Sequence, residues 1–177
     1  MLGFNKDRLY IGLYYRLQPQ PGVYQWVFLV APKGCDDYRK TTRYMVVKKL
    51  RVQADRTGAD LWGLEEELLI PPAATGGLLA RVLIGKIKKS RKEFEESLRA
   101  VPIVQDVPEY DSRDWTQAAI AQLAQDDVLS ESSVTDWDRI VAETEAYVAR
   151  KDEIGRFANL TDRIPTYDLF VNHETIP

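Results

Sequence analysis

The residues best suited to chemistry open a helix in the second half of the chain, within Glu109–Trp115 (EYDSRDW). Asp111 or Ser112 can cap this helix, because a side-chain oxygen at its start accepts a hydrogen bond from a free backbone N–H group. A helix start can also bind an anion or lower the pKa of a nucleophile, since its free amides carry partial positive charge. The candidate nucleophile is the Ser112 hydroxyl, and no histidine lies near it in sequence to act as its base. The pattern alone therefore defines no reaction.

Two further side chains are reactive by type. His173, the only histidine, could act as a general base oriented by Asp168 or Glu174, although a surface position is the simpler expectation. Cys35, the only cysteine, is followed by two aspartates, and neighbouring negative charge raises the pKa of a thiol and blunts it. A single cysteine also excludes an internal disulfide and a cysteine-rich zinc site.

Aromatic side chains are concentrated on the expected strands and on the helix that follows Ser112. Large amphipathic rings line apolar ligand pockets, where phenol and indole groups orient the ligand. The alternative for each ring is a core position with a satisfied polar tip. Among these residues, Trp26, Tyr44 and Trp115 are the candidate ligand contacts, together with Asp111. The full set is Tyr10, Tyr14, Tyr15, Tyr24, Trp26, Tyr44, Trp62 and Trp115.

Three charged or glycine-containing segments have part of a known binding pattern. The basic run Lys86–Lys92 could meet a phosphate or an acidic partner, but such runs are usually solvated in an acidic chain. Glu65–Glu67 lacks the paired histidine or aspartate pattern of a metal site. Gly76-Gly77 lacks the lysine and the helix that follow a phosphate-binding loop. We therefore expect no cofactor and no metal.

Length and composition indicate one globular domain, residues 1–177, with 45% hydrophobic and 29% charged residues. The formal charge of −3 argues against binding to the phosphate backbone of nucleic acids. No apolar stretch approaches the ~20 residues that span a bilayer. The first eight residues carry no apolar run suited to a signal peptide, so a cytoplasmic location and no membrane partner are expected.

The pattern of the chain is strands first and helices second, which predicts an α+β fold with helices packed on a mostly antiparallel sheet. Strands are expected at 8–16, 23–31, 42–50, 61–70 and 78–87, and the fourth could also be a short helix. A turn is expected at 18–22 and a loop at 71–77. Capping-box spacings start helices at Ser90 and at Thr135, the latter helix reaching about Lys151. The middle helix covers 116–127, and the segment 157–177 is expected to be irregular.

Several short segments, in the right order, resemble an uncharacterised family of small fungal proteins that is similar to papain-like NlpC/P60 and LRAT-like domains. They are 8–11 (RLYI), 24–33 (YQWVFLVAPK), 79–86 (LARVLIGK), 134–137 (VTDW), 147–148 (YV), 165–169 (PTYDL) and 174–177 (ETIP). The resemblance implies a papain-like fold. It also implies a histidine on the second strand, another near the third strand, and a cysteine opening the middle helix.

This chain departs from that pattern at all three positions, where it has Gln25, Met45 and Ser112. Glutamine cannot accept a proton at neutral pH, and a serine without a base is a poor nucleophile. Hydrolysis of the cysteine type is therefore expected to be absent. The resemblance also predicts that Gln25 and Ser112 lie close together, because they occupy the positions of a catalytic pair.

Two hypotheses from different classes follow. In the first, the chain is a cofactor-independent enzyme or binder of small molecules in fungal natural-product biosynthesis, of cyclisation or isomerisation type. Gln25 and Ser112 would then be its catalytic groups, and Trp26, Tyr44, Asp111 and Trp115 would contact the substrate. In the second, it is a catalytically inactive papain-like interaction protein.

Overall fold

The structure is a computed structural model that describes residues 6–20, 23–35, 40–52, 57–69, 76–158 and 163–177. Five long strands come first, three helices follow, and two short strands end the described chain. A short 3-10 turn, η3 (Arg156–Ala158), lies after the third helix. The strands are β1 (Arg8–Gln20), β2 (Val23–Ala31), β3 (Thr42–Val52), β4 (Gly58–Leu68), β5 (Leu78–Lys86), β6 (Thr166–Asp168) and β7 (His173–Ile176). The helices are α1 (Arg91–Ala100), α2 (Ser112–Gln125) and α3 (Trp137–Glu153).

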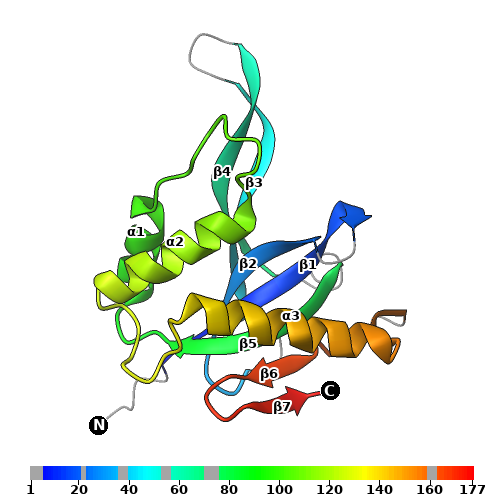
Figure 1. Ribbon diagram of the computed structural model, residues 1–177. Helices are drawn as coiled ribbons and strands as arrows, with labels where there is room; N and C mark the ends of the chain where they lie inside the picture. The colour runs from blue at the N-terminus through cyan, green and yellow to red at the C-terminus, as the bar shows by residue number, and fades with distance from the viewer. Residues whose placement is uncertain (1–5, 21–22, 36–39, 53–56, 70–75, 159–162) are drawn as a thin grey trace.

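The seven strands form one open sheet in the order β4-β3-β2-β1-β5-β6-β7. All neighbouring pairs are antiparallel except β5 and β6, which are parallel. The three helices lie in sequence between β5 and β6, so they form the crossover that a parallel pair requires. Figure 1 shows the helices on one side of the sheet and the β3–β4 hairpin rising away from β1 and β2. The expected α+β class with a mostly antiparallel sheet is confirmed.

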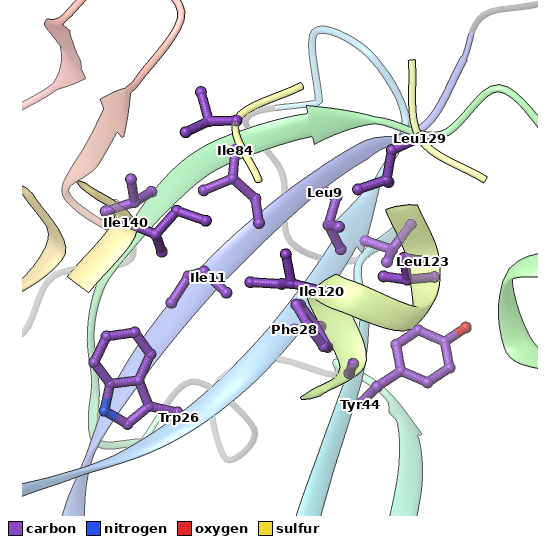
Figure 2. Close-up of a cluster of buried hydrophobic side chains, with 14 of the residues drawn as sticks. Leu9, Ile11, Trp26, Phe28, Tyr44, Ile84, Ile120, Leu123, Leu129 and Ile140 are labelled. Carbon is purple, nitrogen blue, oxygen red and sulfur yellow. The ribbon is translucent and has the colours of Figure 1, made fainter. Parts of the chain in front are cut away.

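The main core lies between the helices and the sheet. Every second residue of β1 and β2 faces it, since successive side chains of a strand point to opposite faces. The helices contribute their buried stripes, and Trp115 of α2 packs against Phe28 of β2 with ring centroids 5.8 Å apart. Figure 2 shows this cluster, with Leu9, Ile11, Trp26, Phe28, Tyr44, Ile84, Ile120, Leu123, Leu129 and Ile140 labelled.

The opposite face of the sheet carries a smaller apolar cluster that contains Tyr10 and Tyr14 of β1. Each of these rings lies under an arginine from a neighbouring part of the sheet. The guanidinium carbon of Arg81 is 4.7 Å from the centroid of Tyr10, and that of Arg43 is 5.0 Å from the centroid of Tyr14. Such cation–π contacts stabilise a face that lacks helices.

The helix starts agree with the capping analysis in two of three cases. Ser90 and Glu93 form the expected capping box of α1. Asp111, one of the two proposed caps, is the N-cap of α2 and forms a second box with Asp114. The expected box at Thr135 is wrong, because Asp136 caps α3 by accepting a hydrogen bond from the Arg139 N–H at 3.0 Å. Aspartate is at least as good an N-cap as threonine, so the helix begins one residue later.

The strand predictions were correct in type and differ in length. β1 continues to Gln20, into the segment expected to turn, and the segment left ambiguous is the strand β4. The expected turn at 18–22 and the expected loop at 71–77 lie partly outside the described residues. The prediction of an irregular segment at 157–177 is wrong, because β6 and β7 form a small antiparallel pair there. These strands are three and four residues long, too short to give a periodic sequence pattern.

Strand β7 is held to α3 by an ion pair between a buried lysine and a partly exposed glutamate. The Lys151 ammonium binds the Glu174 carboxylate, and the Tyr147 hydroxyl donates to the same carboxylate at 2.6 Å. A cavity of about 230 Å³ beside these groups is also lined by Arg150 and Tyr167. Burial raises the pKa of Glu174, but the hydrogen bonds from Lys151 and Tyr147 lower it by a larger amount. The net shift of the pKa is therefore downward. The cluster thus fastens the last strand of the sheet.

Replacing Glu174 by Gln should lower the free energy of unfolding by about 1–3 kcal/mol at pH 7, because it leaves the Lys151 ammonium without a carboxylate. A lowered pKa stabilises the fold above the carboxyl's unfolded pKa, and this stabilisation is lost as the pH falls through the folded value. The difference between wild type and Glu174→Gln in urea unfolding should therefore shrink between pH 7 and pH 3. Glu131→Gln, at an exposed residue, is the control. A difference that is the same at both pH values would contradict the assigned ion pair.

Candidate functional site

The sheet opens between β2 and β3. These strands pair only at Phe28↔Tyr44, Leu29↔Arg43 and Val30↔Thr42. The same register, continued, would place Trp26 opposite Val46, but the two strands separate before this point. β3 instead continues its pairing with β4 as far as Val52. The β3–β4 hairpin therefore leaves the plane of β1 and β2, as Figure 1 shows.

Two side chains satisfy the backbone groups at the point of separation. The Trp26 N–H donates to the Ser112 hydroxyl oxygen at 3.0 Å. The Val46 carbonyl accepts from the Gln25 side-chain amide at 2.9 Å, and the same nitrogen makes a longer contact of 3.5 Å with the Trp26 carbonyl. Buried backbone groups need such partners, because leaving one unpaired costs about 1–3 kcal/mol. Ser112 and Gln25 thus replace the hydrogen bonds that a continuous β2–β3 ladder would make.

A cleft of about 470 Å³ lies at this separation. Its apolar lining comes from three strands and consists of Tyr14, Tyr15, Met45, Val47 and Trp62. Burial raises the pKa of the Tyr14 phenol, which stays neutral. The volume lies within the range of about 300–1,000 Å³ that is typical of small-molecule sites.

The polar lining of the cleft is basic apart from one amide. It consists of Arg16, Gln25, Arg43, Lys48 and Lys49. The Gln25 nitrogen is directed at two carbonyls, which fixes the amide orientation and leaves its oxygen without a hydrogen-bond partner among the described residues. The cleft therefore offers one oriented acceptor and several cationic donors to a ligand.

Asp111 connects the start of α2 to this cleft. One of its carboxylate oxygens caps the helix by accepting from the Arg113 N–H at 2.7 Å, and the other binds Arg16 at 2.6 Å. The Arg16 guanidinium also donates to the Tyr24 carbonyl at 3.1 Å. Asp111, expected to contact a substrate, thus holds the arginine that lines the cleft.

Most side chains expected to form the active site at the helix start are buried. Ser112 and Trp115 have no exposed surface, and Trp26 and Tyr44 are exposed by only 2% and 1%. Of the expected site residues, the structure places Gln25 in the cleft, Asp111 beside it, and the other four in the core. Ser112 lies against the strand that carries Gln25, where its hydroxyl accepts from the backbone N–H of Trp26. Among the described residues, the side chains of Ser112 and Gln25 are not hydrogen-bonded to each other.

The Tyr44 hydroxyl has its own partners on the helix side of the sheet. It donates to Glu95 at 2.9 Å and accepts from Arg91 at 3.2 Å, and Arg91 also binds Asp7 at 2.5 Å. Burial raises the pKa of Tyr44 far above its usual range, and its contact with Arg91 opposes that shift without cancelling it. This network fastens α1 to β3.

The other segments raised by the sequence make local contacts. His173 is exposed, as expected, and Cys35 packs against the smaller apolar cluster. In the basic run, Lys88 binds Asp127 at 2.5 Å, and Lys89 donates to the Asp126 carbonyl at 2.6 Å. Glu65–Glu67 bind arginine and lysine side chains. No group of three or more histidine, cysteine, aspartate or glutamate side chains that could hold a metal was found among the described residues.

The cleft residues missed by the sequence analysis are Arg16, Arg43, Lys48 and Lys49 on β1 and β3. Sequence alternation places Met45, Val47 and Lys49 on one face of β3 and Lys48 on the other. Both faces reach the cleft only because the strand separates from β2. That separation is a long-range property of the fold, and no local pattern in β3 signals it.

The fold and the cleft define an α+β protein with an open, mostly antiparallel sheet that is split on one side by a surface cleft. The chain belongs to a family of unknown function (DUF6914), whose profile matches residues 6–176. No curated protein and no solved structure matches the chain. The papain-like likeness inferred from short segments is therefore not shown. No helix within the described residues is long and apolar enough to cross a membrane.

Replacing Ser112 by Ala should lower the free energy of unfolding by about 1–3 kcal/mol, because it leaves the buried Trp26 N–H without an acceptor. Ser132→Ala, at an exposed serine, is the matched control and should change stability little. Denaturant unfolding of both variants measures the difference. Equal stability of the two variants would show that the Trp26 N–H does not depend on Ser112.

Proposed function

We propose that this chain is a small-molecule-binding protein whose ligand site is the cleft between β2 and the β3–β4 hairpin. The observation that carries the proposal is the splay of the two strands over an apolar floor, with a volume of about 470 Å³. An apolar cavity with a few oriented polar groups is typical of ligand sites.

Gln25 supports this proposal through its fixed orientation. Its nitrogen is bound to the Val46 carbonyl, so the amide oxygen presents a fixed acceptor to a hydroxyl or N–H group of a ligand. A group held in advance loses little conformational entropy when the ligand binds.

The same cleft suits a cofactor-independent cyclisation or isomerisation, the reaction types we propose for an enzymatic role in natural-product biosynthesis. The Gln25 acceptor would fix the substrate, and the Arg16 guanidinium would stabilise negative charge that develops on it. Ser112 is not part of this proposal, since its hydroxyl is fully buried and bound to the Trp26 N–H. Cysteine-type hydrolysis is likewise not proposed.

The neutral dye N-phenyl-1-naphthylamine tests for the site, because its fluorescence rises on entering an apolar cleft. We expect saturable binding to the wild type, and Trp62→Ala should weaken it at least several-fold because this ring lines the cleft. Trp137→Ala is the matched control, since Trp137 packs against Trp26 on the helix side, with ring centroids 5.4 Å apart. Thermal unfolding of both variants verifies that they are folded at the assay temperature. Absence of saturable binding, or equal loss in both folded variants, would overturn the proposal.

Replacing Gln25 by Ala should weaken the binding of the same dye by roughly 1–3 kcal/mol, about 5- to 150-fold, because it removes the acceptor for the dye's N–H group. The melting temperature should fall as well, because Gln25 is the donor to the carbonyl of Val46, a fully buried residue. Parallel measurement of melting temperature and dye affinity separates the two effects. A variant that unfolds while its folded fraction binds normally would make Gln25 purely structural.

The alternative proposal, a catalytically inactive papain-like interaction protein, has one observation in its favour. Leu50 and Val52, on the part of β3 that pairs only with β4, are exposed by 73% and 77%. Exposed apolar side chains at one end of a hairpin are typical of a protein contact. Absence of dye binding to the cleft would favour this alternative.

A further inference from the structure

The cleft differs in charge from the rest of the chain. The whole sequence has a formal charge of −3. No acidic side chain is among the described residues that line the cleft, whereas Arg16, Arg43, Lys48 and Lys49 all line it. Positive charge is therefore concentrated beside the apolar floor of this cleft.

Carboxylates outside the lining offset part of this charge. Asp111 binds Arg16, and Glu67 binds Arg43. Glu65 is shared between Lys49 at 2.8 Å and Arg51 at 3.5 Å. Five cationic groups at and beside the cleft thus meet three carboxylates, which leaves an excess of two positive charges.

Of the four cationic side chains that line the cleft, Lys48 is the one without an ion-pair partner among the described residues. It stands directly opposite Trp62 in the β3–β4 register, so the two side chains lie on the same face of the hairpin. Lys48 is exposed, whereas Trp62 is partly buried against the core. An ammonium next to an aromatic ring can bind the anionic end of a molecule whose apolar part covers the ring.

From this arrangement we propose that the cleft selects amphipathic organic anions: molecules with an aromatic or alkyl body and a carboxylate, sulfonate or phosphate group. The cleft is lined from both faces of the hairpin, by Trp62 and Lys48 on one face and by Met45, Val47 and Lys49 on the other. The apolar body of the ligand lies against Trp62, Met45 and Val47 where these faces meet the cleft, and its anionic group faces Lys48 and Lys49. This inference rests on the proposed function and adds the charge of the ligand to it.

Arg16 contributes to the same selection in a fixed position. It is held by the Asp111 carboxylate and the Tyr24 carbonyl, which use part of the guanidinium's donor set. A guanidinium has five N–H donors, so further donors are available to a ligand. Because the arginine is already held, an anion that binds it does not have to order a mobile side chain.

A matched pair of dyes tests the charge preference. 8-Anilinonaphthalene-1-sulfonate has the same aromatic body as N-phenyl-1-naphthylamine and carries one additional sulfonate. We expect the double variant Lys48→Gln/Lys49→Gln to weaken the anionic dye about 3- to 20-fold relative to wild type, if each surface cation contributes up to about fivefold. Its affinity for the neutral dye should fall less than its affinity for the anionic dye, so the ratio of the two affinities reports the contribution of charge. Raising the salt concentration should weaken the anionic dye only, since salt screens charge.

The control variant is Lys92→Gln combined with Lys33→Gln, which removes the same charge from exposed positions outside the cleft lining. It should leave both dyes unchanged. Equal loss of the anionic dye in both double variants would overturn the inference, because net charge alone would then account for binding. Binding of the neutral dye without any effect of Lys48 and Lys49 on the anionic dye would also overturn it, while leaving the proposed function intact. Failure of both dyes to bind the wild type would overturn the two together.

Discussion

The structure depends on how two backbone groups are satisfied where β2 and β3 separate. The Trp26 N–H and the Val46 carbonyl would pair in a continuous ladder, and they are instead bound by Ser112 and Gln25. A strand cannot leave its neighbour inside a protein unless its buried donors and acceptors find other partners. Ser112 also attaches the first turn of α2 to β2. Side-chain hydrogen bonds of Ser112 and Gln25 thus take the place of backbone pairing between β2 and β3. This exchange opens the cleft on one side of the sheet and attaches helix α2 on the other.

This arrangement accounts for the polar groups at the helix start, which bind other parts of the protein. The Asp111 carboxylate accepts from free amides of the first turn, as part of the capping box with Asp114, and the Ser112 hydroxyl accepts from the Trp26 N–H. With no exposed surface, Ser112 cannot reach a substrate. The second carboxylate oxygen of Asp111 binds Arg16 and so positions this arginine at the edge of the cleft.

The fold class and most elements could be predicted from local patterns, whereas the site could not. The apolar run Val23–Ala31 and the capping box at Ser90 are visible in the sequence because their causes lie within a few residues. β6 and β7 are too short to show the alternation of apolar and polar residues that marks a strand. They are stabilised by tertiary contacts, since β6 pairs with β5 and Glu174 of β7 binds Lys151 of α3. The cleft exists because the pairing of β2 with β3 stops after three residue pairs. The backbone groups left unpaired there are bound by Gln25 and Ser112, which are 87 positions apart in the sequence.

The alternation of side chains along β2 could have distinguished candidate site residues from core residues already at the level of the sequence. Gln25 and Trp26 are adjacent, so they must face opposite sides of the sheet, and one ligand cannot contact both in a regular strand. Trp26 and Tyr44 belong with Phe28 on the helix side, where three helices supply apolar cover. Gln25 lies on the side without helices, in line with Tyr14, its partner in the β1–β2 register. A half-buried polar residue on the uncovered face of a sheet is therefore a stronger pointer to a ligand site than the aromatic residue beside it.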